Sequence, residues 1–139
     1  MTGGSVAAAF EQARAIAAGQ RAALQCAAAA GAPQLPRDVL DDVESQFLWG
    51  VYSELLARGP ATAIGGHDAV IAHLIHHFAA DRGLDFETAR ATARGVEDLF
   101  NQAEPLFESI AERGRLAVSR GGSRHFLEIC HALTEASGQ

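Results

Sequence analysis

The sequence contains no lysine, and all eleven of its basic residues are arginine. This absence excludes enzymes that form a Schiff base through lysine, including the usual pyridoxal enzymes. It also excludes a P-loop, whose lysine contacts nucleotide phosphates. A nucleophile elbow, a His-Glu-x-x-His motif, a Cys-x-x-Cys pair and a dinucleotide-binding fingerprint are absent as well. The sequence therefore predicts no catalytic residue.

Cysteine and long apolar runs are scarce. Only Cys26 and Cys130 are present, which is too few for a disulfide scaffold, and we expect both to be reduced and buried. No apolar run approaches the roughly 20 residues that cross a bilayer. The N-terminus lacks the basic segment of a signal peptide, so we expect a cytoplasmic protein.

Positive charge is in deficit, because the net charge is −6. Duplex nucleic acid is therefore an unfavourable partner, since phosphate binding needs a basic surface. An anionic membrane surface is unfavourable for the same reason. The acidic composition is compatible with binding another protein.

The hydrophobic content of 48% is enough to bury a core, and 139 residues predict a single domain, 1–139. No stretch alternates polar and apolar residues convincingly over six positions, so no strand is predicted. Apolar residues recur instead at helical spacing. The predicted fold is all-α: one antiparallel bundle of about five helices joined by short loops.

Helix start and stop signals place the five helices at residues 5–30, 36–58, 67–82, 85–118 and 123–136. The first helix is rich in alanine, the best helix former. Gly31 with Pro33, and Gly83 with Leu84, resemble C-terminal caps. Asp85 and Ser123 suit N-caps.

The fourth predicted helix has the clearest apolar stripe. The stripe consists of Phe86, Ala89, Ala93, Val96, Phe100, Ala103, Phe107, Ile110 and Val118. Pro105 falls on the opposite, polar side and removes one backbone hydrogen bond. We therefore predict a single long helix that bends near Pro105.

Three histidines fall in the stretch HLIHHF, residues 73–78. His73 and His77 are four residues apart, so a helix presents them on one face, and with a third ligand they could hold zinc. The alternative is that His73 and His76 face water while His77 lies at the edge of the apolar stripe. His67 fits a helix-start or core histidine better than a catalytic base. We expect no cofactor, with zinc at His73 and His77 as the alternative.

The stretch QFLWGVYSELL, residues 46–56, is apolar on two faces. Trp49, Tyr52 and Leu56 form the second face, opposite the one that is expected to face the core. A helix that is apolar all round must be covered all round. Either this helix is central in the bundle, or Trp49, Tyr52 and Leu56 bind a partner, as aromatic residues often do.

Arginines surround a Gly pair in RGRLAVSRGGSRHF, residues 113–126. Free N–H groups at the following helix start, together with Arg120, Ser123 and Arg124, could bind an anion. The alternative is a solvated turn in an arginine-rich protein.

Acidic residues form a strip on the fourth predicted helix: Glu97, Glu104, Glu108 and Glu112. Like charges on one side add no helix stability. The strip is either a solvated face or a docking surface for a basic partner.

These observations predict a protein-binding helical module without catalytic activity of its own, of the adaptor or inhibitor (immunity-protein) type. Its partner would be another protein or a second copy of itself in a homodimer. The alternative is a small-ligand or metal-binding bundle that uses His67, His73 and His77 or the turn between Arg113 and Arg124. An enzyme whose residues meet only in three dimensions is a third possibility that nothing in the sequence supports.

Overall fold

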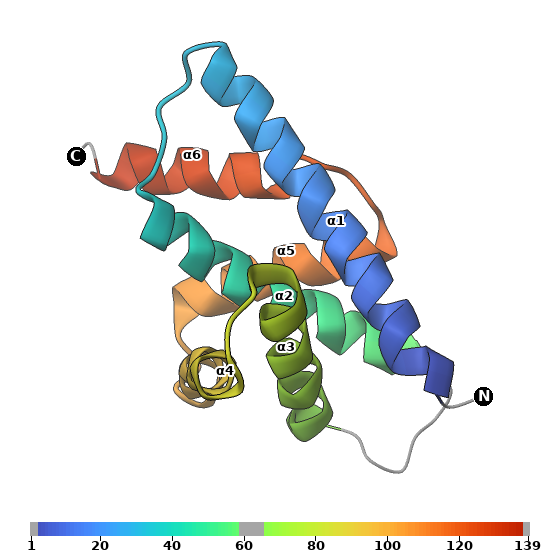
Figure 1. Ribbon diagram of the computed structural model, residues 1–139. Helices are drawn as coiled ribbons and strands as arrows, with labels where there is room; N and C mark the ends of the chain where they lie inside the picture. Colours follow the sequence, from blue (N-terminus) through green and yellow to red (C-terminus); the bar gives the residue numbers. More distant parts are fainter. Residues whose placement is uncertain (1–2, 59–65, 138–139) are drawn as a thin grey trace.

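The structure is a computed structural model that describes residues 3–58 and 66–137. These residues form six helices and no strand (Figure 1). The helices are α1 (Gly3–Ala29), α2 (Arg37–Arg58), α3 (Gly66–Arg82), α4 (Phe86–Asn101), α5 (Pro105–Ser119) and α6 (His125–Ser137). The all-α prediction is confirmed. None of the helices in the described part combines the length and apolar character that crossing a membrane requires.

The predicted single helix over residues 85–118 is two helices, α4 and α5. The chain leaves the helix at Ala103, whose φ is +50°. Pro105 then occupies the first turn of α5, where its missing N–H has no intrahelical acceptor to lose. A carboxylate oxygen of Glu104 accepts a hydrogen bond from the backbone N–H of Leu106 and caps the new helix. The bend that we predicted is therefore a break, because the residue before a proline disfavours the helical conformation.

The other helix ends follow the local signals. Gly31 and Gly83 both have positive φ, +97° and +68°, just beyond α1 and α3. The carboxylate of Asp85 accepts a hydrogen bond from the backbone N–H of Thr88, as expected of the N-cap of α4. α6 begins at His125, two residues after the predicted cap Ser123.

α2 is the central helix of the fold. It contacts each of the other five helices, and its contact with α5 is the most extensive. Figure 1 shows α4 end-on while α6 runs across the view, so the helices do not share one axis. The antiparallel arrangement of the bundle is thus not confirmed.

Two glycines let α2 and α5 approach closely. A Cβ built on Gly50 would lie 1.8 Å from the carbonyl oxygen of Ala111, and one on Gly114 would lie 2.1 Å from that of Phe47. Both clashes are with backbone atoms, which cannot rotate away. The two helices therefore cross at a separation that only glycine at these positions permits.

Candidate functional site

A group of polar and charged side chains lies in the interior where α1, α2 and α3 meet. We call it the His77 cluster, and its members are Arg21, Glu44, Tyr52, His77, Asp81 and Arg82. His77 is fully buried, with 0% of its surface exposed, and Glu44 is almost as deeply buried. Buried charges and imidazoles are unusual unless they are paired, so the partners of His77 and Glu44 decide how the fold tolerates their burial.

The imidazole of His77 is held by one hydrogen bond. The hydroxyl oxygen of Tyr52 lies 2.7 Å from its Nδ1, and either atom donates according to the tautomer. The Phe10 ring contacts the imidazole edge-on, with centroids 5.3 Å apart. Tyr52 and Phe10 come from α2 and α1, so two neighbouring helices fix the orientation of this ring.

The second ring nitrogen of His77 lies near the carboxylate of Asp81. Nε2 is buried and has no hydrogen-bond partner among the described residues. The nearest oxygen of Asp81 lies 3.8 Å away, too far for a hydrogen bond. One ligand atom each of Glu44, His77 and Asp81 lie within 4.8 Å of one another. The three side chains are therefore grouped around a common point.

Two arginines neutralise the carboxylates. A guanidinium nitrogen of Arg21 lies 2.7 Å from Glu44 and 3.6 Å from Asp81. A guanidinium nitrogen of Arg82 lies 3.9 Å from Glu44, and its guanidinium stacks on the ring of Phe78. The cluster is then formally neutral, with two arginines against two carboxylates.

Burial dominates the protonation of the cluster. Desolvation lowers the pKa of His77 to about 4, although Asp81 opposes this shift, so the imidazole is neutral near pH 7. Desolvation likewise raises the pKa of Glu44, while Arg21 and Arg82 lower it. Burial, followed by the charge of Asp81, raises the pKa of the Tyr52 hydroxyl. Tyr52 therefore acts as a neutral hydrogen-bonding group.

Two surface hollows flank the cluster. Glu44 lines one of about 240 Å³, and Asp81 lines another of about 360 Å³. Arg21 lines both, and 37% of its side-chain surface is exposed. Arg21 is thus the member of the cluster that lines both hollows, between Glu44 and the partly exposed Asp81.

The histidines of the predicted zinc pair have different surroundings. His73 is half-buried, and its Nδ1 lies 2.8 Å from the carbonyl oxygen of Ala69. His77 points instead toward Glu44 and Asp81. His67 is exposed at the start of α3, 3.3 Å from a carboxylate oxygen of Glu97. The ring of His73 lies 5.5 Å from that of Tyr52, but neither His67 nor His73 is grouped with Glu44 and Asp81.

The predicted partner-binding residues lie mostly inside the chain. Trp49 and Tyr52 are buried, and Leu56 is half-buried and packs against the core. This placement matches the central-helix alternative for α2. Trp49 lies directly beneath the surface, because its ring centroid is 4.9 Å from that of the exposed Phe100.

Exposed apolar side chains occur where α4 turns into α5. Phe100 is 39% exposed and Leu106 is 48% exposed. With Glu104 and Glu108 they form what we call the α4–α5 corner, at the edge of the molecule in Figure 1. Residues 95–112 contain no basic residue and five acidic ones: Glu97, Asp98, Glu104, Glu108 and Glu112. Glu97 also pairs with Arg94, and Glu112 with Arg115.

The helix start predicted to bind an anion is already capped from α1. The side-chain oxygen of the buried Gln20 accepts hydrogen bonds from the backbone N–H groups of His125 and Phe126, at 2.8 and 3.2 Å. Its amide nitrogen donates to the carbonyl oxygen of Gly122. The predicted anion ligands Arg120, Ser123 and Arg124 are exposed. An anion there would have fewer free N–H donors than the sequence indicated.

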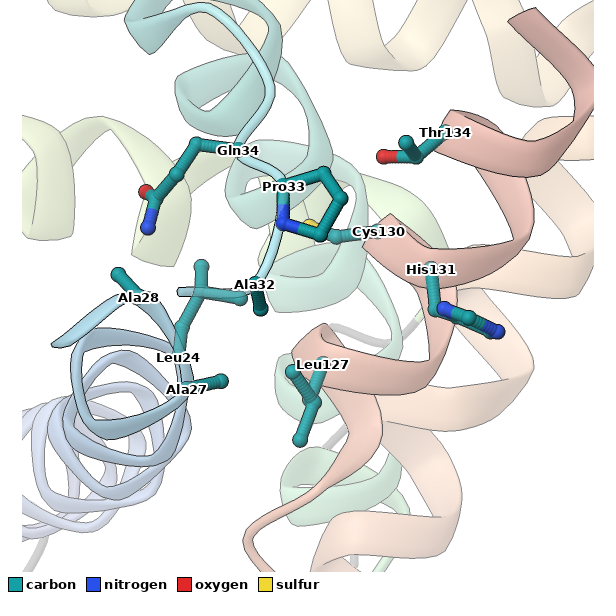
Figure 2. A pocket seen from close by; sticks show the side chains of 10 residues that line it. All are labelled: Leu24, Ala27, Ala28, Ala32, Pro33, Gln34, Leu127, Cys130, His131 and Thr134. Atoms are coloured by element: carbon teal, nitrogen blue, oxygen red, sulfur yellow. The ribbon is translucent and has the colours of Figure 1, made fainter. Parts of the chain in front are cut away.

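Cys130 and His131 are among the residues that line a small pocket between the end of α1 and α6 (Figure 2). Its volume is about 50 Å³, which suits a few water molecules rather than a ligand. Figure 2 shows the side chain of Cys130 directed toward Pro33 and that of His131 directed away. Cys130 is buried as expected, whereas Cys26 is exposed, contrary to the prediction.

The His77 cluster is the arrangement that the sequence missed. His77 and Asp81 are spaced i, i+4 on α3, which is a visible signal for a shared face. Glu44, however, sits beside the apolar face of α2, and Arg21 lies in the alanine-rich α1. No local pattern joins these two to His77. No family model, curated protein or solved structure matches the chain.

Proposed function

We propose that this chain is a protein-binding helical module without catalytic activity of its own, and that the α4–α5 corner is its docking surface. The observation that carries this proposal is the exposure of Phe100 and Leu106 within a segment that bears only acidic charge. Exposed apolar side chains rimmed by polar and charged residues are typical of a surface that a partner covers.

The chemistry of the corner specifies the partner. Negative charge over residues 95–112 favours a partner segment that presents arginine or lysine beside apolar side chains. A second copy of the chain fits poorly, because it would bring the same carboxylates to the same place. The proposed occupant is therefore a basic, amphipathic segment of a different protein, as expected of an adaptor or inhibitor.

Docking at the α4–α5 corner should change the fluorescence of Trp49. Trp49 is the only tryptophan, and the centroid of its ring lies 4.9 Å from that of Phe100 and 6.1 Å from that of Phe107. A segment that covers Phe100 changes the polarity next to this indole. Trp49 fluorescence therefore reports on docking without a label.

The test is a selection of random peptides on the immobilised protein. We expect the enriched peptides to combine basic and apolar residues, to change Trp49 emission, and to bind more weakly at high salt. Leu106→Ser should weaken them about fivefold, because covering half of a leucine contributes about 1 kcal/mol. The matched control is Phe86→Ser, which removes an exposed apolar side chain at the other end of α4.

Three results would count against the proposal. They are the absence of any enriched peptide, enrichment of peptides without basic residues, and equal binding to the wild-type protein and Leu106→Ser. Glu108→Gln gives an independent check of the electrostatic part, since it should reduce both the affinity and its dependence on salt.

A further inference from the structure

We propose that Glu44, His77 and Asp81 form a binding site for a divalent transition-metal ion, with Arg21 as a gate that occupies the site when no metal is bound. This inference is independent of docking at the α4–α5 corner. It shares His77 with the zinc site that the sequence predicts, but Glu44 and Asp81 take the place of His73.

The first argument is the unpartnered nitrogen of His77. Its Nε2 is fully buried, makes no hydrogen bond with any described residue, and lies 3.8 Å from a carboxylate oxygen of Asp81, in a group that also includes Glu44. A buried polar atom without a partner costs about 1–3 kcal/mol, so a fold that keeps one requires an explanation. A metal ion coordinated by Nε2 would provide the partner.

The second argument is the support of the imidazole from its other side. A histidine ligand usually donates its second ring N–H to an acceptor, which fixes the orientation of the ring. The hydroxyl oxygen of Tyr52, 2.7 Å from Nδ1, is placed to accept that hydrogen bond. The ring is thereby oriented for coordination before a metal arrives.

The third argument is the donor set and its spacing. One imidazole and two carboxylates suit zinc, iron(II) or manganese(II), and the absence of thiolate disfavours copper(I). Ligands about 2.1 Å from a tetrahedral zinc lie roughly 3.4 Å apart. The donor atoms now lie within 4.8 Å of one another, so modest side-chain rotation closes the set. Asp81 is 15% exposed and has room to rotate.

Arg21 decides whether the site is open. Its guanidinium bridges Glu44 and Asp81, where it takes the place of a cation. A metal ion must displace it, and the partly exposed side chain can move into the adjoining hollows. Arg82 is less mobile, because it stacks on Phe78 and donates to the carbonyl oxygen of Asp41. Metal binding therefore replaces the guanidinium of Arg21 with a metal ion between the two carboxylates.

The experiment uses the full chain without a histidine tag, after treatment with a chelator. Zinc is titrated by calorimetry and cobalt(II) by its visible absorption. We expect one metal per chain and at least tenfold weaker binding by Asp81→Asn, since even losing a group that supports a ligand weakens metal sites tenfold or more. The control His76→Gln changes an exposed histidine next to His77 and should bind normally.

Arg21→Gln is the variant that separates a metal site from a structural ion-pair network. It removes the competing guanidinium, so it should bind metal severalfold more tightly than the wild-type protein. A gain of affinity cannot arise from misfolding, and circular dichroism checks the fold of every variant.

The proposal is overturned if the wild-type protein binds no stoichiometric metal, or if Asp81→Asn and Glu44→Gln bind it as well as the wild-type protein does. It is also overturned if Arg21→Gln binds metal no more tightly. In those cases the His77 cluster is a buried polar network that holds α1, α2 and α3 together.

Discussion

The close crossing of α2 and α5 makes a quantitative prediction about Gly50. In Gly50→Ala the new Cβ would meet the carbonyl oxygen of Ala111 at 1.8 Å. Restoring an ordinary contact of 3.4 Å requires the two backbones to separate by about 1.6 Å. Phe47 and Ile110 are buried on these helices, and such a shift would disturb their packing.

Two effects of opposite sign set the magnitude. Overpacking costs about 1–3 kcal/mol and sometimes more, and a clash with backbone belongs at the upper end. Alanine in place of glycine inside a helix returns up to about 1 kcal/mol. The net loss for Gly50→Ala should be at least about 2 kcal/mol, which lowers the melting temperature by roughly 4–8 °C in a domain of this size.

The assay is urea unfolding followed by circular dichroism and Trp49 fluorescence. Gly95→Ala is the matched control, because its Cβ would meet nothing within 4 Å and α4 should gain stability. Gly114→Ala should behave like Gly50→Ala. The double variant should lose less than the sum of the two, since one separation of the helices relieves both clashes. Equal stability of Gly50→Ala and Gly95→Ala would refute the close crossing.

Two further predictions concern buried polar groups elsewhere. Gln20→Ala should lower the free energy of unfolding by about 2–4 kcal/mol, because it leaves two N–H groups of α6 and one carbonyl oxygen unpaired. In the same urea assay, Gln25→Ala should change the free energy of unfolding little, because Gln25 is exposed. Burial raises the pKa of the Cys130 thiol, so less of its reactive thiolate is present at pH 8. A thiol reagent should therefore label the exposed Cys26 much faster than the buried Cys130. Equal labelling rates, measured by mass spectrometry, would contradict the placement of Cys130.

The helix boundaries that the sequence predicts well are those with local chemical causes. Asp85 caps α4, and Gly83 ends α3 in a left-handed conformation. The missed boundary lies between α4 and α5. There the apolar stripe continues from Phe100 to Phe107 in the sequence, and both rings contact Trp49 although they lie on different helices. The periodicity of apolar residues thus persists across a break in the helix that the proline marks.

The candidate site was less predictable because its members come from separate helices. Helical periodicity placed His77 at the edge of an apolar stripe, but the neighbouring helices decide whether an edge position is buried. α1 and α2 cover it with Phe10 and Tyr52, which also set the direction of the imidazole. The pairing of Glu44 with Arg21 likewise depends on how α1 crosses α2.

The position of the proton on the His77 imidazole tests most directly whether the interior of this fold is prepared to coordinate a metal. Without metal, we expect the proton on Nε2, which lies 3.8 Å from a carboxylate oxygen of Asp81, and we expect the Tyr52 hydroxyl to donate to Nδ1. With one equivalent of zinc, Nε2 coordinates the ion and the proton should move to Nδ1. Long-range ¹H–¹⁵N spectra of the histidine rings distinguish the two tautomers. A His77 spectrum that zinc leaves unchanged would contradict the account.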